Sequence, residues 1–171
     1  MSDDRRNHLV LAYCAVAVIV SLYAVGIESH GIIRHIVQTA PLWIGVWLAW
    51  RNSELTKWAL LPCFVLWLVL MINIWFLLLG LPHFLSGDFT PIEIVLTVII
   101  GVACIIGVIR GISVRSAVPA SRAAAVTAAL LIIQLLCLRI SFLPGVARDP
   151  WYHADRRHAV YRSSSRARSR S

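Results

Sequence analysis

Charged side chains are scarce in this sequence. Only 14% of its 171 residues are Asp, Glu, Lys or Arg, while 59% are hydrophobic. Soluble domains average about 25% charged and roughly 45–50% apolar residues. The shortage of charge excludes a water-soluble protein, and the length leaves no room for a separate soluble catalytic domain beside the apolar segments.

The motifs of common enzyme and cofactor classes are also missing. The sequence has no Walker loop, dinucleotide fingerprint, G-x-S-x-G elbow or H-E-x-x-H helix. Its four cysteines form no C-x-x-C pair, and each lies in a different apolar segment: Cys14, Cys63, Cys104 and Cys137. We expect them to be small buried hydrophobic residues, and we predict no catalytic residue, no cofactor and no metal site.

Long apolar runs dominate instead. They lie at about 9–27, 31–50, 58–81, 91–110 and 120–140, and each approaches the roughly 20 residues that cross hydrocarbon. We predict an all-α polytopic transmembrane helical bundle of five spans at 9–145. It would follow a cytoplasmic head at 1–8 and precede a basic Arg/Ser-rich tail at 146–171, which we expect to be disordered.

The second run is the ambiguous one, because Arg34, His35 and Gln38 precede Pro41 within it. Proline removes the backbone hydrogen bond to the carbonyl of Val37, and a membrane tolerates this only where neighbours cover the freed group. We predict a span kinked near Pro41. The alternative is a re-entrant helix, which would leave four spans, as would cleavage of the first run as a signal peptide.

Basic residues mark alternate connections between the runs. They are Arg51 and Lys57 beside the second, and Arg110, Arg115 and Arg122 beside the fourth, while the third, 82–91, has no Lys or Arg. We expect the protein to lie in the cell (plasma) membrane, and the positive-inside rule then places its N-terminus on the cytoplasmic side. The tail falls outside, where its arginines would meet anionic lipid headgroups; nucleic acid is not an expected partner.

Two patterns describe the fourth run. Thr90 and Glu93 flank Pro91 as a capping box, which fixes the helix start and gives Glu93 a structural role in preference to a catalytic one. Ala103, Gly107 and Gly111 repeat every four residues, a small-residue ladder that permits close helix packing. The partner of this ladder would be another helix of the chain or a second protein in a homo- or hetero-oligomer.

Polar residues cluster at the end of the first run and the start of the second. His83 and Arg139 are expected on the same membrane side as this cluster. The candidate polar group is therefore Glu28, His30, Arg34, His35, Gln38, His83 and Arg139. We predict an ion pair between Glu28 and Arg139. The plainer interpretation is that these side chains merely mark helix ends at the interface, and the spacing of His30 and His35 disfavours a helical zinc site.

The stretch from Glu28 to His35, continuing through 38–43, resembles small bacterial inner-membrane proteins of unknown function. The likeness covers the hydrophobic body, implies a bacterial inner-membrane location, and implies no activity. Our first expectation is an accessory or structural membrane subunit that assembles through the fourth run. Two alternatives remain: a small transporter or lipid-handling protein that uses the polar group, and a membrane redox or metal enzyme built on His30, His35 and His83.

Overall fold

The computed structural model describes residues 3–81, 89–114, 116–143 and 146, with the side chains from residue 5 onward. Five helices account for most of them: α1 (Asp3–Glu28), α2 (Ile32–Trp50), α3 (Thr56–Leu78), α4 (Pro91–Ser113) and α5 (Ala120–Ser141). All five are long and apolar enough to cross a membrane, and the described residues contain no strand. The predicted all-α bundle with five candidate spans is therefore confirmed. The part of the tail from residue 147 onward lies outside the described residues.

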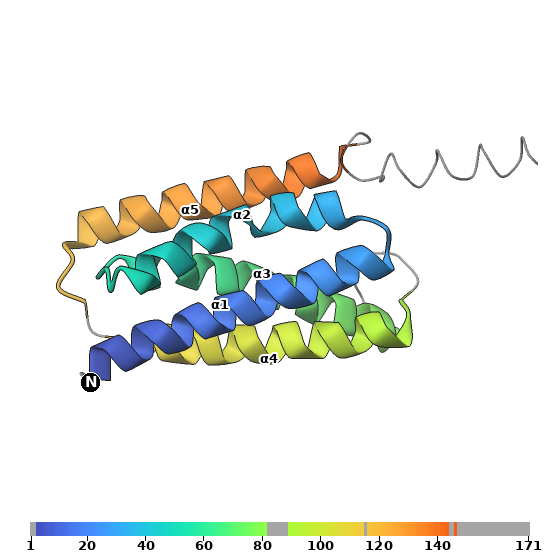
Figure 1. The fold of residues 1–171 in the computed structure, drawn as a ribbon, viewed down its shortest axis with the longest axis horizontal. Helices are drawn as coiled ribbons and strands as arrows, with labels where there is room; N and C mark the ends of the chain where they lie inside the picture. The colour runs from blue at the N-terminus through green and yellow to red at the C-terminus, as the bar shows by residue number, and fades with distance from the viewer. Residues whose placement is uncertain (1–2, 82–88, 115, 144–145, 147–171) are drawn as a thin grey trace, which may run out of the picture.

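The helices lie roughly along one common axis and form an elongated bundle (Figure 1). α1 packs against α2 and α4, α3 packs against α4, and α5 packs on α2 and α3. The main core cluster draws residues from α1 to α4, with the ring of Phe64 and the side chains of Leu11 and Leu60 fully buried. α5 therefore lies at the outside of the bundle.

Hydropathy located the helices well, and local chemistry explains their ends. α1 begins six residues before the predicted span and ends in a Schellman motif: the N–H of Gly31 donates to the Gly26 carbonyl at 2.8 Å and the N–H of His30 to that of Ile27 at 3.3 Å. His30 holds the left-handed position of this turn, with φ 52°. α2 ends in the same way at Asn52, with φ 49°.

The capping box at the start of α4 is present as predicted. The hydroxyl of Thr90 accepts the N–H of Glu93 at 3.3 Å, and the carboxylate of Glu93 accepts the N–H of Thr90 at 2.8 Å. Two of the otherwise unpaired amides at the helix start are satisfied in this way.

The small-residue ladder of α4 faces the interior of this chain. Ala103, Gly107 and Gly111 are all buried. A Cβ added to Gly107 would lie 2.6 Å from the ring of Phe64, and one added to Gly111 would lie 3.1 Å from Leu61. Large side chains of α3 fill the ladder, so it joins α4 to α3, and assembly with a second protein would use another face of α4.

α5 is attached by polar residues at heptad spacing: Thr127, Gln134 and Ser141. The hydroxyl of Thr127 donates to the carbonyl of Trp58 at 3.2 Å. Pro62 lacks an N–H, so this carbonyl has lost its usual partner within α3. α5 thus covers a backbone acceptor that a proline exposes.

Polar side chains of α5 also lie near Pro41, the proline of α2. The Gln134 amide donates to the carbonyl of Gln38 at 2.9 Å, one residue beyond the Val37 carbonyl that Pro41 deprives of its helical partner. The Gln38 amide in turn donates to the hydroxyl of Ser141 at 2.8 Å. α2 continues through Pro41 as one helix, as a spanning segment requires, with polar groups of α5 beside it.

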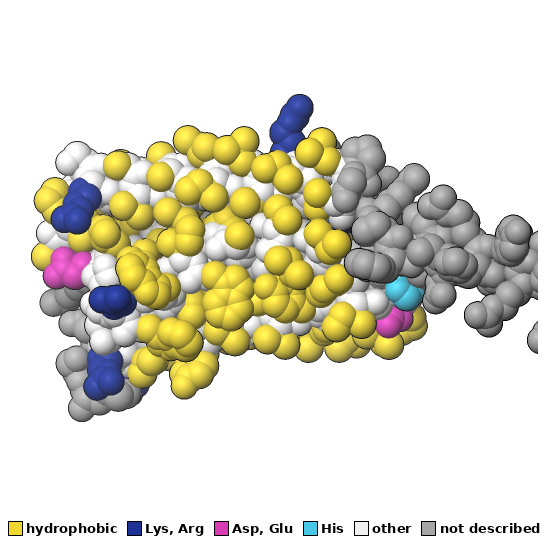
Figure 2. Space-filling view, turned by 45° about the horizontal axis from the view of Figure 1, so that its top comes forward, with side chains coloured by type: hydrophobic (Ala, Val, Ile, Leu, Met, Phe, Trp, Pro, Cys, Tyr) yellow, Lys and Arg dark blue, Asp and Glu magenta, His cyan; other side chains and the backbone are white. Residues whose placement is uncertain are grey.

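Most of the bundle surface is apolar, and charge is confined to its ends. Figure 2 shows a hydrophobic belt with most Lys and Arg side chains at the end where α1 begins. Trp43, Trp47 and Trp50 are exposed on α2, as expected for a stripe that faces lipid. The belt is what a helical bundle presents to a bilayer.

Candidate functional site

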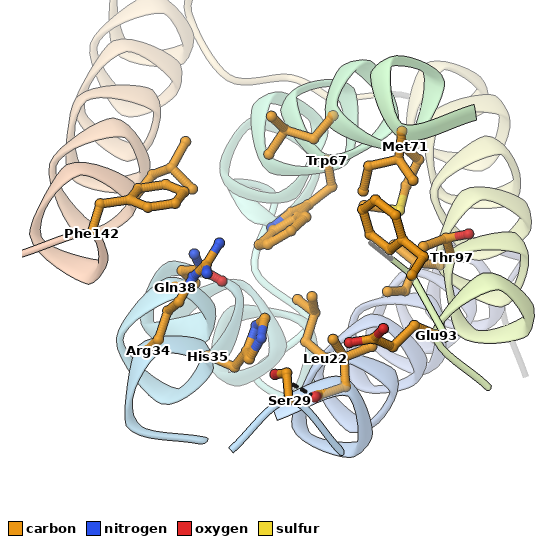
Figure 3. Close-up of a pocket in the computed structure, with 16 residues that line it drawn as sticks. Leu22, Ser29, Arg34, His35, Gln38, Trp67, Met71, Glu93, Thr97 and Phe142 are labelled. Carbon is orange, nitrogen blue, oxygen red and sulfur yellow. Dashed lines mark hydrogen bonds between the residues drawn. The ribbon is translucent and has the colours of Figure 1, made fainter. Parts of the chain in front are cut away.

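The predicted polar cluster divides into residues that line a cavity and residues that lie outside it. Glu28 and Arg139 are both exposed and form no ion pair, so the predicted pairing is wrong. The reason is the position of α5, which packs on α2 and α3 and leaves α2 between the last turns of α1 and α5 (Figure 3). Each of these charges instead faces the surroundings of the bundle.

Two of the three histidines in the metal or redox alternative lie in the described part of the chain. His30 occupies the turn between α1 and α2, His35 lies in the first turns of α2, and His83 is outside the described residues. Within the described ranges, no three His, Cys, Asp or Glu side chains are close enough to hold a metal ion. Three of the cysteines are buried in the core, as predicted, and Cys137 is half-buried.

Arg34, His35 and Gln38 come together at a cavity of about 380 Å³ at the end of the bundle where α1, α3 and α5 finish. Its lining includes residues of all five helices. The side chains labelled in Figure 3 surround one space, with α2 contributing one side and α4 the opposite side. The charged and polar lining residues, Trp67 aside, are Ser29, Arg34, His35, Gln38, Glu93 and Thr97.

Four buried polar atoms around this cavity form no hydrogen bond of normal geometry with the described residues, although the side chains of His35 and Gln38 interact with each other. They are Nε of Arg34, Nδ1 of His35, Oε1 of Gln38 and Nε1 of Trp67. The side chains of His35, Gln38 and Trp67 are only 7%, 2% and 4% exposed. Because burial of an unpaired polar group costs roughly 1–3 kcal/mol, such atoms are normally satisfied by protein, water or ligand.

Arg34 supplies the positive charge of the cavity. Its guanidinium carbon lies 4.3 Å from the centre of the Phe142 ring, a cation–π contact. No described carboxylate neutralises it. A cation in the first turn of a membrane helix requires an anion or water at its head group, which makes it a functional candidate.

Close packing between α1 and α2 holds His35 at the cavity wall. A Cβ on Gly26 of α1 would lie 2.8 Å from the His35 ring, so this position admits no larger side chain without movement. The hydroxyl of Ser29 is engaged with the Val25 carbonyl at 2.8 Å. The imidazole therefore has a fixed neighbour on one side and the cavity on the other (Figure 3).

The negative side of the cavity was missed by sequence reasoning. Glu93 does cap α4, but its carboxyl group also lines the cavity, beside Thr97 one turn later. Trp67 and Met71 of α3 were missed as well, because large apolar side chains surround α3 almost completely and give little signal of which side is inward. The capping box could have suggested Glu93 only if the position of α4 had been known.

Comparison with known proteins finds no match to a protein-family model, to a curated protein or to a solved structure.

Proposed function

We propose that this protein is a lipid-handling membrane protein that binds one amphipathic molecule in the cavity at the end of its bundle. The cavity combines a few polar groups with an apolar lining from Leu22, Leu70 and Ile74. That combination is typical of sites for small ligands, whose volumes run from about 300 to 1,000 Å³. A headgroup would meet the polar groups and a chain would follow the apolar ones.

The observation that carries this proposal is the set of unpartnered polar atoms around the cavity. Residues that only marked a helix end would be exposed to headgroups and water, whereas His35 and Gln38 are nearly fully buried. A structural subunit would have most of its buried polar atoms paired within the fold. Away from the cavity, Thr127 and the amide donor of Gln134 are paired, and Oε1 of Gln134 is a single atom without a described partner, whereas four such atoms gather around the cavity. The orphaned atoms here favour a ligand site over a purely structural role.

An accessory or structural subunit is the second candidate. The face of α4 opposite the glycine ladder is exposed and strongly apolar, as at Val95, Val102 and Ile109. Such a face suits a partner helix and equally suits lipid. It supports assembly through α4 less specifically than the cavity supports a ligand.

The ends of the bundle suggest its orientation in a cell membrane. Arg6, Arg51, Arg110 and Arg122 lie at the end opposite the cavity, where the positive-inside rule favours the cytoplasm. The cavity and the start of the tail would then face the outside. Anionic headgroups remain the partner that we propose for the tail.

This orientation can be tested with single cysteines in a background without the native four. Ser121→Cys at the basic end and Glu28→Cys at the cavity end both replace exposed residues. In intact cells we expect an impermeant thiol reagent to label Glu28→Cys and to spare Ser121→Cys until the cells are opened. The reverse pattern would place the cavity on the cytoplasmic side.

Filling the cavity tests the function itself. Leu138 lines the cavity from α5, and Leu135 is exposed on the same helix. We expect Leu138→Trp to reduce lipid retained by the purified protein, measured by native mass spectrometry, by about tenfold, which corresponds to roughly 1.4 kcal/mol of overpacking. Leu135→Trp should retain the wild-type amount. Equal lipid retention by the two variants would contradict a ligand in the cavity.

A further inference from the structure

We infer that the ligand of this cavity carries a zwitterionic headgroup, whose anionic oxygens bind Arg34 and whose ammonium binds Glu93. The inference rests on the proposed function and names the chemistry of its ligand. It follows from two opposite charges that line the same cavity from different helices without pairing with each other.

The anionic part fits the α2 and α3 side. A guanidinium has five donors, and the contact of Arg34 with the Phe142 ring uses its face and leaves the N–H groups available. The indole N–H of Trp67 is a further unpartnered donor on the adjacent helix. Arginine donors in a fork bind the two oxygens of a phosphate or carboxylate better than a point charge does.

The cationic part fits the α4 side. One carboxylate oxygen of Glu93 accepts the Thr90 N–H, and a carboxylate has about four acceptor positions in all. The N-terminal end of α4 offsets only about half a unit of its charge. A purely anionic ligand would bring a second negative charge into the cavity that contains the Glu93 carboxylate. An ammonium group would instead compensate the charge of this carboxylate.

The setting indicates a lipid as the source of the zwitterion. Apolar side chains line most of the cavity, and the bundle that contains it is built of candidate membrane spans. The volume of about 380 Å³ is at the lower end of the range for ligand pockets and suits a headgroup with its first chain carbons. Phe142, which lines the cavity yet is half exposed, marks where the chains can pass into the bilayer.

Matched charge removals test this assignment in the full-length protein. Glu93→Gln removes the charge and keeps an acceptor for the capping box, which works with glutamine as well. Arg34→Gln removes the cation, and Arg34→Lys retains it. Arg139→Gln and Glu28→Gln make the same charge changes at exposed positions of the same end that do not line the cavity.

Binding would be measured by native mass spectrometry after incubation with vesicles of phosphatidylethanolamine, which is zwitterionic, or phosphatidylglycerol, which is anionic. We expect the wild type and both control variants to prefer phosphatidylethanolamine by about tenfold. Glu93→Gln should lose that preference, Arg34→Gln should weaken binding of both lipids, and Arg34→Lys should restore part of it. Thermal unfolding of each variant would identify any loss that comes from misfolding.

Several outcomes would overturn the inference. Equal binding of the two lipids by the wild type, or a preference that Glu93→Gln leaves unchanged, would show that the site selects an anion alone. Binding of soluble phosphoethanolamine as tight as that of the lipid would assign the site to a water-soluble zwitterion. If Leu138→Trp lowers lipid binding while these results hold, only the headgroup assignment fails; if Leu138→Trp has no effect, the proposed function fails with it.

Discussion

α4 and α5 are both apolar candidate spans, yet they join the bundle in different ways. α4 presents Ala103, Gly107 and Gly111, and large side chains of α3 fill the space that they leave. α5 presents Thr127, Gln134 and Ser141, and hydrogen bonds connect these to α2 and α3. The ladder contact depends on shape, and a hydrogen bond from the Trp75 indole to the Thr97 hydroxyl at 3.3 Å adds to it. The α5 contact depends mainly on donors and acceptors.

Both kinds of contact follow from the lipid surroundings. Lipid chains are as apolar as leucine, so burial from lipid gives little driving force, and helices associate through van der Waals packing and interhelical hydrogen bonds. Packing dominates at the ladder of α4, where Phe64 and Leu61 fill the space beside Gly107 and Gly111. Hydrogen bonds serve α5 because Pro62 leaves a backbone carbonyl unpaired on α3, and lipid offers no donor for it.

The largest effect should come from filling the space at Gly107. A Cβ there would already lie 2.6 to 2.9 Å from atoms of the Phe64 ring, which is fully buried. We expect Gly107→Leu to lower the free energy of unfolding by about 1–3 kcal/mol, the usual cost of overpacking, in a detergent unfolding titration.

The partner substitution sharpens this prediction. Phe64→Ala should itself destabilise the protein, and combining it with Gly107→Leu should recover part of the loss, because the added side chain then has room. If Gly107→Leu has wild-type stability, the ladder does not pack on α3 and the contrast between the two helices disappears.

A smaller effect is expected at the hydrogen bond between α5 and α3. Thr127→Val keeps the shape and removes the donor to the Trp58 carbonyl, so stability should fall by roughly 0.6 kcal/mol, the average for such bonds. In a Pro62→Ala background, residue 62 regains its N–H and can pair with that carbonyl within α3. Thr127→Val should then cost less, and an equal cost in both backgrounds would show that the proline does not create the need for the bond.

The smallest effect should come from the exposed charges at the cavity end. Glu28→Leu and Arg139→Leu should each change stability by less than about 0.5 kcal/mol, as is usual for surface substitutions. The double mutant should show strict additivity, since the two residues form no ion pair. A coupling energy near 1 kcal/mol would mean that they meet in the membrane-embedded protein.

Sequence reasoning performed best where one helix decides the answer. The hydropathy of each run was enough to predict five candidate spans, and the pairing of Thr90 with Glu93 was enough to predict where α4 begins. It failed where two distant helices must be placed side by side. The pairing of Glu28 with Arg139 was predicted from their shared membrane side, and the structure places α2 between the ends of α1 and α5.

The candidate site shows the same division. Arg34, His35 and Gln38 stood out as a polar group because polar residues are rare in an apolar run, and only the structure places them at a cavity. Trp67 could not be predicted, because α3 is apolar nearly all round and its hydropathy does not distinguish the inward face. The sequence identified Glu93 as a helix cap. Its second role, as a lining residue of the cavity, depends on how α4 is oriented toward α2.

Composition and hydropathy by themselves determined that this chain forms apolar helices suited to a membrane, because a backbone without water must satisfy its own hydrogen bonds within each segment. Only the tertiary structure decided which helices touch, that the glycine ladder serves α3, and that a cation and a carboxylate line one cavity. The physical reason is that helix formation is local, whereas packing in lipid depends on shape and on hydrogen bonds between residues far apart in the chain.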